Sequence, residues 1–163
     1  MASPPLTELL RRRHRTLEAR IASLEVDGRA RRPRVLQLAE ELVAHATVEQ
    51  LVLYPYAEQL LGVRDLALEI ERAVDALLGV VGGIDDNAEF AVAIARLSSV
   101  FDRHVDGDEV GLLPMIETLG DPYQLVRMGE TIEDFERALS TSRTTRPDLW
   151  PEETALRSGG GRN

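Results

Sequence analysis

The chain has 163 residues and a formal net charge of −9, with 44% hydrophobic and only 4% aromatic residues. This length allows one domain with a substantial core, and the charge argues against nucleic acid or an anionic membrane as a partner. Cysteine is absent, which excludes disulfides, thiolate zinc sites and iron–sulfur clusters. All 19 basic residues are arginine, so a lysine Schiff base is excluded as well. The sequence shows no signal peptide and no apolar stretch of membrane-spanning length, so we expect a cytoplasmic protein.

The first predicted helix begins after Ser3, which suits an N-cap, with Pro4 at its first helical position, and it ends at Asp27. Its apolar positions recur at intervals of four and three, the spacing of one buried helical face. We call such a series the seam of a helix, and here it consists of Leu10, His14, Leu17, Ile21 and Leu24. His14 is therefore predicted to be buried. The arginines at 11–13, at 15 and between 29 and 34 are interpreted as a solvated surface.

The second predicted helix runs from Val35 to Tyr54, where Pro55 kinks or ends it, with a last turn reaching Gly62. His45 and Glu49 lie on its seam, one turn apart on the same face. The full seam reads Val35, Leu38, Leu42, His45, Glu49 and Val52. Burying an unpaired carboxylate costs several kcal/mol. The pair therefore needs a compensating positive charge, for which a metal ion is the first candidate.

A third helix is predicted from Val63 to Val81, stopped by the following glycines. Its seam lacks a histidine and reads Ala67, Glu71, Val74, Leu78 and Val81. Apolar residues follow Glu71 at the same three offsets at which they follow His14. Glu71 thus takes, in the third helix, the place of His14 in the first.

The fourth predicted helix extends from Asp85 to about Leu113, and its seam ends in His104 and Asp108. This pair repeats the spacing of His45 and Glu49. Aligned on the histidines, HATVEQLVLYPYAEQL and HVDGDEVGLLPMIETL also share Leu53/Leu112, Pro55/Pro114, Glu58/Glu117 and Leu60/Leu119. The sequence therefore predicts a duplicated helical hairpin.

A shorter and more polar helix is predicted from Pro122 to Leu139, with its apolar residues on one side. Beyond it the composition shifts to Ser, Thr, Arg, Pro and Gly. We assign residues 1–140 to one helical domain and residues 141–163 to an extended or disordered tail.

Antiparallel helices joined by short loops form an up-down four-helix bundle, which is the all-α architecture that we predict. Such a bundle brings the four seams to one axis, so that three imidazoles and three carboxylates meet at mid-height. These residues are His14, His45, Glu49, Glu71, His104 and Asp108. The set fits two metal ions bridged by carboxylates, and nitrogen–oxygen ligation favours iron or manganese. The alternative is a buried polar network without metal, which is tolerated only when every group is satisfied.

These residues and their spacing resemble the hemerythrin family, specifically the bacterial hemerythrin-like HHE cation-binding domains. The resemblance covers nearly the whole chain, from His14 to the tail. It implies a non-haem di-iron centre in an up-down four-helix bundle. It also implies that Glu49 and Asp108 bridge the two irons and that the histidines are terminal ligands.

Glu71 departs from the family pattern, which usually has histidine at this position. Extra carboxylate donation stabilises ferric over ferrous iron, which weakens the case for reversible oxygen carriage. We therefore favour a di-iron oxidoreductase acting on peroxide or dioxygen, with an organic substrate left open. The alternative is a module that binds or senses oxygen, nitric oxide or iron without turnover. Tyr54 and Tyr56 lie near the His45/Glu49 turn, where core packing competes with roles as hydrogen-bond donors to the ligands or as radical sites.

Overall fold

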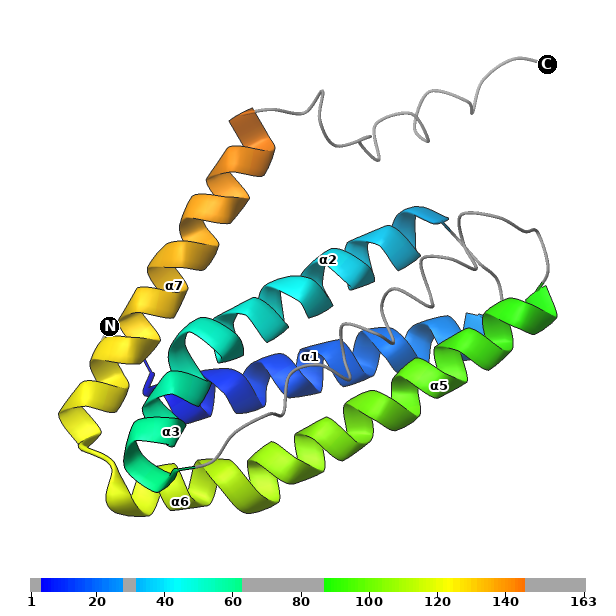
Figure 1. Ribbon diagram of the computed structural model, residues 1–163. Coiled ribbons are helices and arrows are strands. Elements are labelled where there is room, and N and C mark those ends of the chain that lie inside the picture. The colour runs from blue at the N-terminus through cyan, green and yellow to red at the C-terminus, as the bar shows by residue number, and fades with distance from the viewer. Residues whose placement is uncertain (1–3, 28–31, 63–86, 146–163) are drawn as a thin grey trace.

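The computed structural model describes residues 4–27, 32–62 and 87–145, and every regular element in these ranges is helical (Figure 1). In chain order the elements are α1 (Leu6–Asp27), α2 (Arg32–Val48), the π-helix η1 (Glu49–Leu53), α3 (Tyr54–Leu61), α5 (Asn87–Asp106), the π-helix η2 (Gly107–Leu112), α6 (Leu113–Leu119) and α7 (Pro122–Thr145). The prediction of an all-α protein is confirmed. The predicted third helix, with Glu71, lies outside the described residues. Among the described helices none is long and apolar enough to cross a membrane.

The long helices α1, α2 and α5 lie side by side, with α1 running opposite to the other two (Figure 1). This direction agrees with an up-down bundle. α1 begins at Leu6 rather than at Pro4 as predicted, and its first backbone bond joins the N–H of Leu9 to the carbonyl of Pro5 (3.1 Å). The cause is the Pro4-Pro5 pair, because a residue that precedes proline is disfavoured in the helical conformation.

The last helix, α7, is longer than the sequence predicted, since it ends at Thr145 rather than at Leu139. Continuing an existing helix costs little even through Ser and Thr, because each added residue gains a backbone hydrogen bond. α7 packs against the start of α1, where Gly129 is buried beside Pro4. Its C-terminal half extends beyond the other helices (Figure 1). The division of the chain into domain and tail at residue 140 stays a prediction.

Two apolar clusters fill the interior and leave a polar layer between them. The first cluster, which we call the α1–α2–α5 core, is built around Leu17, Ile21, Leu38, Leu42, Phe90, Ile94, Leu97 and Phe101. The second, the end core, joins the start of α1 to the turns after the π-helices and to α7, through Leu6, Leu10, Leu53, Leu113, Ile116, Leu125 and Ile132. The buried polar residues His14, His45, Glu49 and Asp108 lie along their helices between these two cores.

Candidate metal centre

Two of the three predicted carboxylates, Glu49 and Asp108, lie at the start of a π-helix. Glu49 opens η1, and the N–H of Tyr54 bonds to its carbonyl five residues back. Asp108 lies in η2, and the N–H of Leu113 bonds to its carbonyl in the same way. Pro55 and Pro114 follow in the first turn of the next α-helix. The predicted duplication thus extends to backbone geometry, and such widened turns often occur at functional sites.

Three imidazole nitrogens face a single carboxylate oxygen, Glu49 Oε1. The Nε2 atoms of His45, His104 and His14 lie 3.1, 3.3 and 3.4 Å from it. The Nε2 atoms of His45 and His104 are also 3.3 Å apart. α1, α2, η1 and α5 each contribute one of these residues, so the site depends on the packing of the bundle. His14, His45, Glu49 and His104 form a group whose ligand atoms all lie within 4.8 Å of one another and that could hold a metal ion.

Asp108 lies at the edge of this group. Its Oδ2 is 4.0 Å from His104 Nε2 and has no hydrogen-bond partner among the described residues. Burial, helped by the charge of Glu49, raises the pKa of Asp108 to about 7. Burial alone would also raise the pKa of Glu49, but His45 and the hydrogen bonds of the surrounding imidazoles hold it well below its usual range. The two carboxylates therefore differ, since three imidazoles compensate Glu49 at close range, whereas those near Asp108 do not outweigh its burial.

Glu109 is a site residue that the sequence interpretation missed. Its Oε1 lies 2.9 Å from His14 Nδ1, the ring nitrogen that points away from the cluster. The side chain of Glu109 is 26% exposed, whereas that of His14 is fully buried. In a regular α-helix successive residues are about 100° apart, so a residue directly after Asp108 falls off the seam. The only sequence signal was its place beside Asp108.

The two tyrosines near the site have different roles. Tyr54 donates a hydrogen bond to Glu49 Oε2 (3.4 Å), so it touches the oxygen that the imidazoles leave free. Burial and the charges of Glu49 and Asp108 raise the pKa of Tyr54 far above its usual value. The Tyr56 hydroxyl instead accepts a hydrogen bond from the N–H of Asp121 (3.2 Å), at the corner between α6 and α7. Tyr56 therefore holds this corner together rather than contacting the ligands.

The donor spacing fits a cation. Neighbouring ligands bound to one ion at about 2.1 Å lie about 3.0–3.4 Å apart in octahedral or tetrahedral sites. The distances of 3.1 to 3.4 Å between each Nε2 atom and Glu49 Oε1 match this spacing. Because a carboxylate only accepts, His14 Nδ1 carries the hydrogen shared with Glu109. In the neutral form of His14 with its hydrogen on Nδ1, Nε2 carries no hydrogen and faces Glu49 Oε1, acceptor against acceptor. A bound cation removes this conflict, so the residues present fit a metal.

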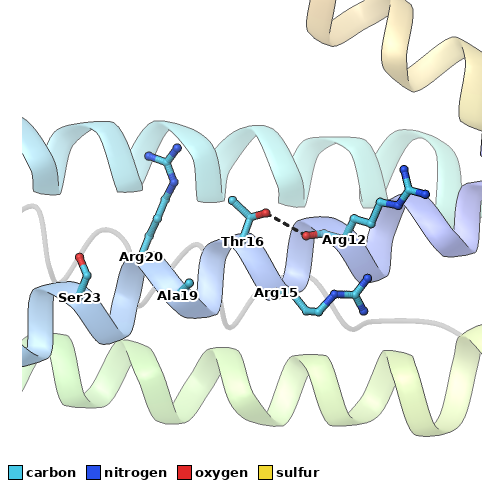
Figure 2. Close-up of a pocket in the computed structure, with 6 residues that line it drawn as sticks. All are labelled: Arg12, Arg15, Thr16, Ala19, Arg20 and Ser23. Atoms are coloured by element: carbon cyan, nitrogen blue, oxygen red, sulfur yellow. Dashed lines mark hydrogen bonds between the residues drawn. The ribbon is translucent and has the colours of Figure 1, made fainter.

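A surface pocket in the described part of the chain does not belong to this centre. It lies along α1 and is lined by Arg12, Arg15, Thr16, Ala19, Arg20 and Ser23 (Figure 2). Arg12 pairs with Glu8, and Arg20 lies 2.9 Å from Glu41. The exposed Arg12 and Arg15 fit the predicted solvated surface. Arg13 does not fit it, because its Nε and Nη2 atoms are buried.

The fold and the site together define an α-helical bundle protein with a buried histidine–carboxylate centre suited to a metal ion. Residues 6–116 match the sequence model of the family described as "Hemerythrin HHE cation binding domain", and the chain belongs to this family. The match runs from the first residue of α1 into α6 and ends before α7. No curated protein and no solved structure shows significant similarity to the chain.

Proposed function

We propose that this protein binds a pair of iron ions and acts as an oxidoreductase on peroxide or dioxygen. The convergence of three Nε2 atoms on Glu49 Oε1 carries the proposal, because it gathers nitrogen and oxygen ligands at the spacing of a common ion. His14, His45, Glu49 and His104 would hold metal directly. Asp108, with an oxygen that lacks a partner among the described residues, would complete the set. Glu71, which lies outside those residues, is proposed as a further ligand from its place in the repeat.

Burial of the site favours a small reactant over a bulky organic substrate. The side chains of His14, His45 and Glu49 are 0, 2 and 1% exposed, and that of His104 is 6% exposed. The Phe101 ring lies against all three imidazoles, with centroid distances of 5.7 to 6.1 Å. This packing excludes water on the side of the α1–α2–α5 core. A diatomic molecule or peroxide needs far less space to reach the ligands than an organic substrate does.

Iron bound here would supply the redox chemistry, and the chain determines which reaction is favoured. The carboxylate-rich ligand set, Glu71 included, stabilises the ferric state and so supports turnover over reversible oxygen carriage. The hydrogen bond from the Tyr54 hydroxyl to Glu49 Oε2 restricts the rotation of this carboxylate group. Peroxide disproportionation needs no external reductant, because one peroxide is oxidised to dioxygen while another is reduced to water.

The test measures iron content and peroxide consumption of the purified protein. We expect a pair of irons per chain and peroxide turnover, both lost in His45→Ala and both kept in Val43→Ala, which changes an exposed residue of the same helix. Glu71→His should keep iron, slow peroxide turnover and raise the reduction potential. Glu69→His, at a position off the predicted seam, should change neither the peroxide turnover nor the reduction potential. Iron-loaded protein that binds dioxygen reversibly without consuming peroxide would instead identify a binding or sensing module.

A further inference from the structure

Glu109 connects the buried centre to the surface through one hydrogen bond. Its carboxylate lies 2.9 Å from His14 Nδ1, while the opposite nitrogen of the same ring, Nε2, faces Glu49 Oε1 at 3.4 Å. His14 thus has a defined partner at each end of its ring. His45 does not, because its Nδ1 is buried without a hydrogen-bond partner among the described residues. The imidazoles of the centre are therefore not equivalent.

The π-helix η2 explains how Glu109 reaches α1. Asp108 and Glu109 follow one another in the wide turn between Gly107 and Leu112, and the chain presents both acids to the bundle. Asp108 is buried at the centre, and Glu109 lies at the contact with α1. The first copy of the repeat has Gln50 at the position equivalent to Glu109. The carboxylate is therefore specific to the second copy, whose residue at this position contacts His14 Nδ1.

We propose that Glu109 is a positioning residue, which fixes the tautomer and the ring orientation of His14 so that Nε2 is free to bind metal. The chemistry is that of a carboxylate acting through a ligating histidine: the acid accepts the Nδ1 hydrogen and raises the basicity of Nε2. The buried ring of His14 has no exposed edge at which water could replace this acceptor. This inference rests on the proposed metal centre, with His14 as its best-oriented ligand.

The first experiment compares the ferrous iron affinity of the wild type with Glu109→Ala, Glu109→Gln and Asp106→Asn. Removing an acceptor behind a ligating histidine lowers metal affinity by about 10–100-fold, so Glu109→Ala should bind iron that much more weakly. Glu109→Gln keeps an oxygen that can accept the same hydrogen and should restore most of the affinity. Asp106→Asn removes an equal charge from an exposed position at the end of α5, three residues before Glu109, and should bind like the wild type.

The second experiment follows the His14 ring by ¹⁵N NMR in metal-free and zinc-loaded protein. The wild type and Glu109→Gln should show a hydrogen on Nδ1 of His14, and Glu109→Ala should show a change of tautomer or tautomer exchange. Circular dichroism and urea unfolding of the metal-free variants establish that each is folded. Unchanged affinity and an unchanged tautomer in Glu109→Ala would overturn the inference, as would an equal loss of affinity in Glu109→Gln. Failure of the wild type to bind metal would reject the proposed function, yet the tautomer in metal-free protein would still test Glu109.

Discussion

The contacts of single residues decide how α1 is held against the site. Arg11 donates two hydrogen bonds to Glu117 of α6, at 2.5 and 3.1 Å. This bidentate pair lies one helical turn from His14 and joins the start of α1 to the turn that follows Asp108. Because both side chains are partly exposed, at 25% and 40%, solvent weakens the pair. Its contribution is geometric as well as energetic, since a bidentate Arg–carboxylate pair fixes the orientation of the two helices that carry it.

The pH dependence of this ion pair provides a residue-scale prediction. The hydrogen bond from Arg11 lowers the pKa of Glu117 in the folded protein. A lowered folded pKa means that the stabilisation is present above the unfolded pKa and is lost as the pH falls through the folded value. A double-mutant cycle with Arg11→Gln and Glu117→Gln should give a coupling of about 0.2–1 kcal/mol at neutral pH. Urea unfolding in acid should show the coupling disappear, and a coupling independent of pH would contradict the assignment.

At the scale of elements, α7 depends on a close approach to the start of α1. A Cβ atom on Gly129 would lie 2.1 Å from the carbonyl oxygen of Pro4 and 3.3 Å from the amide nitrogen of Leu6. Both obstacles are backbone atoms that cannot rotate away. The family match ends at residue 116, so α7 lies outside the matched part of the chain. α7 contributes Leu125 and Ile132 to the end core, beside the π-helical turns.

Gly129→Ala should therefore displace α7 and destabilise the protein by about 1–3 kcal/mol, the usual cost of overpacking. Gly111→Ala is the matched control, because a Cβ there has no atom within 4 Å. The control should be neutral or stabilising, since Ala is favoured over Gly within a helix by roughly 0.5–1 kcal/mol. Urea unfolding measures both variants. Equal changes in the free energy of unfolding for the two variants would show that α7 does not pack against the first residues of the chain.

For the molecule as a whole, the metal centre is the layer that joins two apolar cores. Without a cation, His14, His45, Glu49 and Asp108 form a buried polar layer in which Asp108 Oδ2 and His45 Nδ1 lack partners among the described residues. Buried polar groups that are only partly satisfied cost stability. A bound cation should therefore stabilise both halves of the bundle together.

Metal removal tests this coupling at the level of global stability. With free metal at about 100 times its dissociation constant, binding to the folded state adds about 2.7 kcal/mol. For a domain of this size that corresponds to roughly 5–10 °C in Tm. Thermal unfolding with and without a chelator should show this shift in the wild type and none in His45→Ala. An identical Tm for chelated and metal-loaded wild type would favour a metal-free polar network.

As far as the two carboxylates Glu49 and Asp108, the helical period was enough to predict which residues are buried. Beyond Glu49 the prediction was wrong, because Leu53 rather than Val52 is fully buried after the π-helical turn. All three histidines, Glu49 and Asp108 lie on seams spaced by three and four residues, and each is buried or nearly so. The repeated His-carboxylate pair with its proline likewise indicated one site built from two similar turns. These features are local, because a residue's face on a helix depends only on its spacing from its neighbours.

The neighbours across helices were decided only by the tertiary structure. The contact of Glu109 with His14 crosses from η2 to α1. The separate roles of Tyr54 and Tyr56 depend on what lies opposite each hydroxyl, Glu49 in one case and Asp121 in the other. The π-helices shift the register directly after each carboxylate, where an α-helical period points Glu109 away from the site. A sequence read at a fixed period cannot reveal an extra residue in a turn, because packing against other helices selects the wider turn.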